Sequence, residues 1–277
     1  MPELPEVETV RRGLEKLWLK MPSIVDILLK RKDLRFPFPK KLRENLIGKR
    51  ILGVRRRAKY LLIDTQDGVL LSHLGMTGSW REVKVGEVDE FADDPHSHVE
   101  LILDDGRKFI YRDPRRFGML DYFLKSKESS HPRLKALGPE PLNDEFASEY
   151  LFAKSRKRAT AIKVFIMNQE IVVGVGNIYA SEALFRARIK PTKLAGKISK
   201  DESAKLVLAI KSVLEEAIIA GGSTIRDYTQ AGGDEGRFQD SHQVYERKGK
   251  PCPNCSAPIK SKVIGGRSTY WCSVCQK

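Results

Sequence analysis

The chain lacks the features of an exported or membrane-embedded protein. No apolar run in its 277 residues approaches the roughly 18 residues of a membrane-spanning helix. The amino terminus, MPELPEVETV, carries glutamates where a secretory signal has an apolar stretch. We therefore expect a soluble cytoplasmic protein that does not bind membranes, and the length predicts about two domains.

Cysteine is scarce, with four residues that all lie within the last 26. Their order is Cys252-x-x-Cys255, sixteen residues, then Cys272-x-x-Cys275, which is the spacing of a four-thiolate zinc site. Two disulfides are the alternative, but nothing in the sequence indicates export to an oxidising compartment. The pattern predicts one Zn²⁺ with a structural role, because four thiolates leave no coordination position for water.

Acidic residues are sparse where basic residues are dense. The net charge is +14, residues 30–59 hold thirteen Lys and Arg, and residues 154–169 hold five with no acid. After Glu246 the chain has seven Lys and Arg and no acid. Separate basic segments of this kind can converge on one polyanion, which indicates nucleic acid. An anionic membrane surface is disfavoured, because no long basic amphipathic helix with aromatic anchors is present.

Hydrophobic periodicity predicts helices and strands in separate parts of the chain. Apolar residues at helical spacing predict a helix over residues 5–20, whereas alternation around two turns, Gln66–Gly68 and Asp105-Gly106, predicts strands from about 50 to 124. Residues 134–142 read as a linker, and helices follow it. Ser199 and Glu202 form a capping-box pattern, and Gly221-Gly222 ends that helix.

The segment between the cysteine pairs predicts a β-hairpin. Gly265-Gly266 supplies a tight turn between Val263-Ile264 and the alternating residues that follow. Arg267 then lies at the hairpin tip, within a segment whose charges are all positive. We expect it to contact phosphate.

Several sequence blocks, in order along the chain, carry a family likeness. They are MPELPEVETVRRGL (1–14), RRAKYLL (56–62), SHLGMTGS (72–79), YRDPRRFG (111–118), LGPEPL (137–142), VGVGNIYASE (173–182) and QVYERKGKPC (243–252). With the closing cysteine hairpin, the chain resembles the bacterial formamidopyrimidine-DNA glycosylase family. The resemblance implies an α+β fold with an N-terminal two-layer β-sandwich and flanking helices. A helix–two-turn–helix module and a zinc-finger β-hairpin would follow. The corresponding ranges are 1–134 for the sandwich domain, 135–142 for a linker, 143–242 for the helical domain and 243–277 for the finger.

The family's activity implies roles for residues near the amino terminus. The resemblance implies a monomeric, bifunctional DNA glycosylase and AP lyase of base excision repair, acting on double-stranded DNA with oxidised purines or abasic sites. Pro2, freed by removal of Met1, would be the nucleophile that forms a Schiff base, since an α-amino group titrates well below a lysine. Glu3 matches the general acid, and Glu6 matches an orienting acid. Lys59 matches the lysine of β-elimination, and Arg267 matches the arginine of δ-elimination.

The same resemblance implies a set of DNA contacts. Met76, Arg115 and Phe117 match the residues that fill the space left by the extruded nucleotide, although periodicity alone predicts core positions for Met76 and Phe117. Positions that bind the DNA backbone are matched by His73, His96, Arg158, Asn177 and Tyr245. Residues 223–241 match the loop that covers the everted base. No function is predicted for the acidic segment 87–94.

Two other functions remain open from the sequence. The sister endonuclease VIII family, directed at oxidised pyrimidines, shares the proline, the helical module and the finger. Here Glu3-Leu4-Pro5-Glu6, with Met76 and the Arg115/Phe117 pair, favours the purine-directed branch. A non-catalytic zinc protein that binds DNA is the third reading, and it predicts no dependence on Pro2.

Overall fold

The protein is described by a computed structural model that covers residues 2–223 and 236–277. Its contacts divide the chain into two compact units. The first comprises Met1–Lys135 with Gly221–Gly236, and the second Ala136–Ala220 with Arg237–Lys277. Most of the predicted base-covering loop, residues 224–235, lies outside the described residues.

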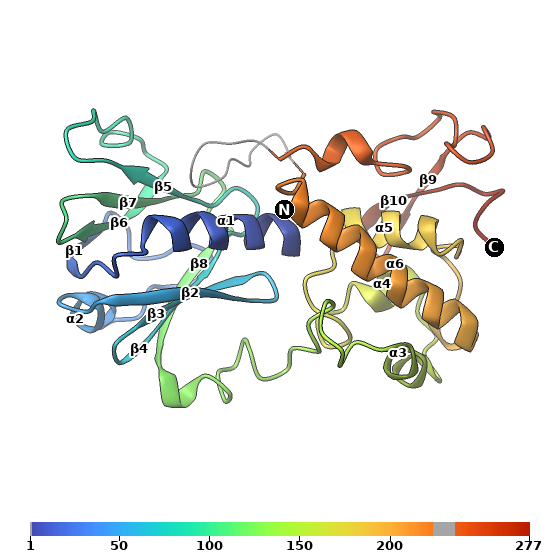
Figure 1. Ribbon diagram of the computed structural model, residues 1–277, viewed down its shortest axis with the longest axis horizontal. Helices are drawn as coiled ribbons and strands as arrows, with labels where there is room; N and C mark the ends of the chain where they lie inside the picture. The colour runs from blue at the N-terminus through green and yellow to red at the C-terminus, as the bar shows by residue number, and fades with distance from the viewer. Residues whose placement is uncertain (1, 224–235) are drawn as a thin grey trace. The chain divides into compact units, whose positions relative to one another are not determined.

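The first unit consists of two antiparallel four-stranded sheets and a long helix, α1 (Leu4–Leu17) (Figure 1). One sheet has the order β1-β6-β7-β5, with β1 Ile24–Leu29, β6 Ser97–Leu103, β7 Lys108–Arg112 and β5 Ser79–Val83. The other has the order β2-β3-β4-β8, with β2 Ile51–Arg57, β3 Tyr60–Thr65, β4 Gly68–His73 and β8 Met119–Leu124. Short helices α2 (Leu42–Leu46) and η1 (Lys125–Lys127) complete the unit. The β-sandwich expected from the sequence is confirmed.

One hydrophobic core joins the helix to both sheets. Val10 and Leu14 of α1 belong to the same buried cluster as Trp80 and Phe109 of one sheet and Leu61 of the other. Burial of apolar surface on this scale is the main favourable term for folding the unit. It also fixes the start of α1 and the strand ends that carry the predicted site residues.

The second unit is helical and ends in a small hairpin. Its helices are α3 (Ser148–Ser155), α4 (Ile162–Ile166), α5 (Asn177–Arg186) and α6 (Lys200–Ile219), with turns η2 (Ala195–Lys197) and η3 (Phe238–Ser241). The capping box of α6 is confirmed: Glu202 N–H donates to Ser199 Oγ over 3.0 Å, and Ser199 N–H donates to Glu202 Oε2 over 2.9 Å. No helix among residues 2–223 and 236–277 is long and apolar enough to cross a membrane.

The predicted hairpin is present as β9 (Lys260–Ile264) and β10 (Arg267–Trp271). Arg267 pairs with Ile264 across the turn, so only Gly265 and Gly266 connect the strands. Both glycines have left-handed backbone angles, with φ of 57° and 72°, as a two-residue turn of the primed type requires.

Candidate active site and metal centre

The first cluster of predicted site residues lies at the amino end of α1. Pro2 and Glu3 are buried, and Glu3 is the residue that caps the helix. The fully buried carboxylate of Glu6 accepts the Glu3 N–H at 2.8 Å and the Ser223 N–H at 2.8 Å. The Glu6 carboxylate therefore links the backbone of Glu3, the residue after Pro2, to the backbone of Ser223.

Lys59 lies in the two-residue turn between β2 and β3, where Ala58 has a φ of 54°. Arg56 fixes this turn, because its Nη1 donates to the Ala58 carbonyl over 3.0 Å and its Nε pairs with Glu8 of α1 at 3.1 Å. Lys59 itself is buried, with 8% of its surface exposed. The turn that carries this lysine is thereby attached to the second turn of α1.

His73 ends β4 and packs its ring 5.0 Å from the ring of Tyr60, its cross-strand neighbour. Its Nδ1 accepts the Gly75 N–H at 2.9 Å, so the neutral ring carries its proton on Nε2. Burial, followed by the positive charge of Lys59, lowers the pKa of His73 to about 4. The imidazole is neutral at physiological pH.

Met76, Arg115 and Phe117 lie on two loops that touch each other, residues 74–78 and 113–118. Phe117 is 44% exposed, Arg115 is exposed and Met76 is partly exposed. The core position that periodicity alone predicts is therefore wrong for Phe117, because its loop leaves the ring exposed, whereas Met76 is partly exposed. The resemblance had placed both among the DNA contacts.

The two loops approach so closely that glycine is required at the contact. A Cβ on Gly75 would lie 2.3 Å from the Phe117 carbonyl carbon, and one on Gly118 would lie 1.8 Å from the Tyr111 hydroxyl. That hydroxyl donates to the His73 carbonyl over 2.9 Å. The SHLGMTGS and YRDPRRFG blocks thus form one packed structure.

His96 lies next to the acidic segment 87–94, for which no function was predicted. Asp94 Oδ1 accepts the His96 N–H at 2.9 Å, and the Asp94 carboxylate also pairs with Arg112. On the other side, the Asp113 N–H donates to the His96 carbonyl over 2.9 Å. Asp94, the last residue of that segment, therefore fixes the backbone at His96, next to Asp113.

In the second unit, a buried lysine joins Asn177 to the hairpin. Lys163 Nζ donates to Asn177 Oδ1 over 2.5 Å and to Thr269 Oγ1 over 2.8 Å. Asn177 Nδ2 donates to the Ser268 carbonyl over 2.9 Å and lies 3.5 Å from the Tyr245 hydroxyl. Asn177 and Tyr245 are thereby brought together with β10, the strand that begins at the exposed Arg267. The exposed Arg158 follows α3, and its carbonyl accepts the Gly196 N–H at 2.9 Å.

Sequence reasoning missed two charged residues that organise this unit, Lys163 and Glu182. Glu182 is fully buried in α5 and accepts the N–H groups of Gln243, Val244 and Tyr245 at 2.8 to 3.0 Å. Burial raises the pKa of Glu182, and these three N–H groups oppose the rise. The sequence signal for Glu182 was a single carboxylate within the apolar run NIYASEALF. A carboxylate buried in such a helix needs hydrogen-bond donors from a neighbouring segment.

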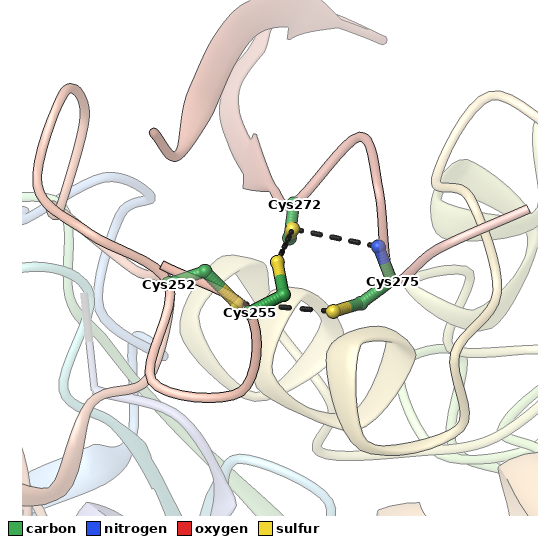
Figure 2. Close-up of side chains that lie close together, drawn as sticks. All are labelled: Cys252, Cys255, Cys272 and Cys275. Carbon is green, nitrogen blue, oxygen red and sulfur yellow. Dashed lines mark hydrogen bonds between the residues drawn. The ribbon is translucent and has the colours of Figure 1, made fainter. Parts of the chain in front are cut away.

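The four cysteines form a compact metal site (Figure 2). All four Sγ atoms lie within 4.8 Å of one another, with Cys255 and Cys272 3.4 Å apart and Cys252 and Cys275 3.9 Å apart. A tetrahedral zinc with Zn–S bonds of about 2.3 Å places its sulfurs about 3.8 Å apart, and a disulfide places them at about 2.05 Å. The cysteines therefore fit one structural Zn²⁺, and the disulfide alternative is excluded.

The finger is packed onto the helical part of its unit. Gln276 Nε2 donates to the Ile189 carbonyl over 2.8 Å, while its Oε1 accepts the Cys272 N–H at 2.9 Å. Cys252 and Cys272 share an apolar cluster with Phe185 of α5. A metal held by the four cysteines would stabilise β10, whose Ser268 carbonyl accepts Asn177 Nδ2.

Comparisons with known proteins agree with this architecture. Family models match residues 1–120 as "Formamidopyrimidine-DNA glycosylase N-terminal domain", residues 137–229 as "Formamidopyrimidine-DNA glycosylase H2TH domain", and residues 249–277 as "Zinc finger found in FPG and IleRS". The chain is 50% identical to the formamidopyrimidine-DNA glycosylase of Bdellovibrio bacteriovorus, with all of both chains covered. It is similar to the crystal structure of the MutM (FPG) protein of Thermus thermophilus, with 39% identity, a TM-score of 0.88, and 99% and 98% of the two chains covered. An FPG mutant of Lactococcus lactis bound to Fapy-dG-containing DNA is 35% identical, with a TM-score of 0.90 and full coverage of both chains. The chain belongs to the formamidopyrimidine-DNA glycosylase family.

Proposed function

We propose that this protein is a bifunctional DNA glycosylase and AP lyase that removes oxidised purines from double-stranded DNA. The substrates are 8-oxoguanine and formamidopyrimidine lesions, and abasic sites for the lyase step. The observation that carries the proposal is the buried start of α1, where Pro2 and Glu3 lie side by side and Glu6 fixes their backbone. An acid beside a terminal amine is the arrangement that covalent catalysis at a sugar needs.

The reaction begins once Met1 has been removed and Pro2 has a free secondary amine. The Pro2 nitrogen attacks C1′ of the sugar, the bond to the damaged base breaks, and the amine loses its proton. Glu3 then protonates O4′, the C1′–O4′ bond breaks, and the opened sugar is left as an iminium on Pro2. The iminium withdraws electrons and acidifies C2′, so loss of the C2′ proton expels the 3′ phosphate. A second elimination, assigned to Arg267, expels the 5′ phosphate.

Lys59 is the second group we assign to the elimination steps. Its turn is attached to α1 through Arg56 and Glu8, which gives it a fixed place relative to the helix start. Because Lys59 is buried beside the neutral ring of His73, a substrate phosphate brought there would gain a cation from which water is largely excluded. His73, His96, Arg158, Asn177 and Tyr245 are assigned to DNA-backbone binding.

Zinc has no chemical step in this proposal. When bound, it supplies folding energy to the finger, which holds β10 and presents Arg267. We further propose that the protein acts as a monomer in the cytoplasm, on the chromosomal DNA of a bacterium.

Borohydride trapping tests the mechanism directly. With duplex that carries 8-oxoguanine opposite cytosine, reduction should convert the iminium into a permanent cross-link at Pro2, located by mass spectrometry. A form that retains Met1 is the matched control, since it keeps every basic residue and should bind DNA without excising or trapping. Trapping at Lys59 with Pro2 unmodified would refute the mechanism. Stronger trapping on oxidised pyrimidines would indicate the endonuclease VIII type, and DNA binding without any trapping would indicate a non-catalytic protein.

A further inference from the structure

The two loops that carry Met76, Arg115 and Phe117 are joined through one buried carboxylate. Asp113 is completely buried, and its two oxygens face different loops. Oδ1 accepts the Thr77 hydroxyl at 2.5 Å, and Oδ2 accepts the Gly118 N–H at 2.8 Å. The carboxylate therefore closes the 113–118 loop on itself and attaches it to the neighbouring 74–78 loop.

The backbone of Asp113 extends the connection to β6. Its N–H donates to the His96 carbonyl over 2.9 Å, and its carbonyl accepts His98 Nε2–H at 2.9 Å and the Arg116 N–H at 3.1 Å. Pro114 follows, and after it comes the exposed 115–117 tip. Asp113 is thus fixed through both its side chain and its backbone at the base of that tip.

The Thr77 hydroxyl has two tasks at once. It donates to Asp113 Oδ1 and accepts the Arg115 N–H at 3.1 Å, and the side chain is only 6% exposed. Thr77 also directly follows Met76 in the sequence. A single hydroxyl thus sets the backbone at Arg115 relative to the backbone at Met76.

We propose that Asp113 and Thr77 are positioning residues for extrusion of the damaged nucleotide. They hold the two loops in one arrangement, so that Met76, Arg115 and Phe117 enter the DNA together rather than one at a time. This rests on the proposed function. The three side chains must fill one space in the DNA together. If their backbones were not already ordered in the free protein, ordering them on binding would cost conformational entropy.

The chemistry of the pair explains why a small change should matter. When a buried carboxylate loses one hydrogen-bond donor, its desolvation free energy is no longer offset by that bond. Replacing Thr77 by Val preserves size and removes the hydroxyl, which leaves both Asp113 Oδ1 and the Arg115 N–H without this partner. The polar link between the two loops is then lost, while their contact at Gly75 and Gly118 and the sandwich core remain.

The test compares two DNA substrates: one whose damaged base must be extruded from the duplex before cleavage, and one that requires less extrusion. Thr77→Val is assayed under single-turnover conditions on duplex with 8-oxoguanine opposite cytosine and on duplex with a pre-formed abasic site. We expect excision of 8-oxoguanine to slow by about tenfold, the loss for one charged buried hydrogen bond. Nicking at the abasic site should change by less than about twofold, because that site is already partly unstacked. Thr77→Ser, which restores the hydroxyl, should recover both rates.

The matched control is Thr65→Val. Thr65 is also fully buried, and its hydroxyl donates to the Gly68 carbonyl over 2.9 Å and lies 3.3 Å from the Gly68 N–H. It is the last residue of β3, at the opposite end of the β3–β4 hairpin from His73. Thr65→Val should lower thermal stability as Thr77→Val does and leave the ratio of the two rates unchanged.

Asp113→Asn provides a second approach. The amide oxygen can still accept the Gly118 N–H, and the NH₂ then donates to the Thr77 hydroxyl, so the link between the loops loses its charge and weakens. The ratio of abasic-site nicking to 8-oxoguanine excision should rise as in Thr77→Val. Equal losses on both substrates in Thr77→Val, or the same change of ratio in Thr65→Val, would overturn the positioning role. If the unaltered protein excises nothing and cuts no abasic site, the proposed function itself fails.

Discussion

The guanidinium carbon of Arg115 lies 4.9 Å from the centre of the Phe117 ring, and both side chains are exposed. Such a cation–π contact is worth about 0.5–1 kcal/mol at an exposed site. In the free protein the cation covers one face of the exposed Phe117 ring. When the ring inserts between stacked bases, the bases contact its faces instead. The contact with Arg115 thus makes an apolar ring less costly to expose and leaves it able to insert into DNA.

The first prediction concerns Phe117. Phe117→Ala should slow excision of 8-oxoguanine by about tenfold or more, because loss of one aromatic stacking contact costs about 1–3 kcal/mol. Nicking of a pre-formed abasic site should be affected less. Phe36→Ala is a matched control, since Phe36 is also exposed, at 36%, and the guanidinium carbon of Arg133 lies 4.1 Å from the centre of its ring. If both variants lose equally on both substrates, Phe117 does not act as a wedge.

The second prediction concerns the metal. Protein purified without chelator should contain one zinc per chain by metal analysis. Cys255→Ser should lose zinc and weaken DNA binding by releasing the hairpin that holds Arg267, since structural zinc contributes folding energy directly. Ser273→Ala, a change at an exposed position between Cys272 and Cys275, is the control. It should retain both the zinc and the affinity for DNA. Unchanged DNA binding by a zinc-free variant would show that the finger is dispensable.

The third prediction concerns salt. Binding to lesion DNA should weaken with a log–log slope of roughly −4 or steeper, because each phosphate contact releases about one counterion. Arg267→Ala should make the slope shallower by about one. Lys205→Ala removes a charge that is also exposed but is already paired with Asp201 at 2.7 Å. It should leave the slope almost unchanged. Titrations by fluorescence anisotropy over a range of salt concentrations measure all three, and a flat response in the unaltered protein would contradict the electrostatic argument.

The fourth prediction concerns pH. The pKa of His73 is lowered to about 4 in the folded protein, whereas an unfolded histidine titrates near 6.5. Between these values the unfolded state binds more protons, so stability falls as the pH falls. For His73 the loss from pH 7 to pH 5 is at most about 2 kcal/mol. His73→Asn should flatten this dependence in urea unfolding, because an amide oxygen can still accept the Gly75 N–H. Burial also lowers the pKa of His242 to about 4. The contribution of His242 to the pH dependence of stability should therefore remain in this variant. An equally steep dependence in His73→Asn would show that the ring is not held neutral by the fold.

Patterned segments made most of the fold predictable. The strand pairs around Asp105-Gly106, the capping box at Ser199 and the hairpin at Gly265 are local, because neighbouring residues determine them. The zinc site was predictable for the same reason, since cysteine spacing is itself a constraint on geometry. The exposure of Phe117 was not, because alternation of apolar residues cannot reveal a loop that turns outward.

Long-range polar contacts were the other feature that the sequence could not reveal. Glu6 and Ser223 are 217 positions apart, and Lys163 and Thr269 are 106 apart. No periodicity links such residues, and a lysine in a basic segment reads as a solvated charge. The structure instead shows Lys163 fully buried with three acceptors.

The close contact of Gly75 and Gly118 with the neighbouring loop and Tyr111 has a consequence for genetics. A methyl group at either position would meet backbone or a fixed hydroxyl within 2.3 Å, so alanine there must push the loops apart. In a screen for loss of repair, such alleles would be scored alongside changes at Pro2, although their atoms take no part in bond breaking. Alleles of this kind would mark a region of the gene that tolerates almost no variation for reasons of space alone.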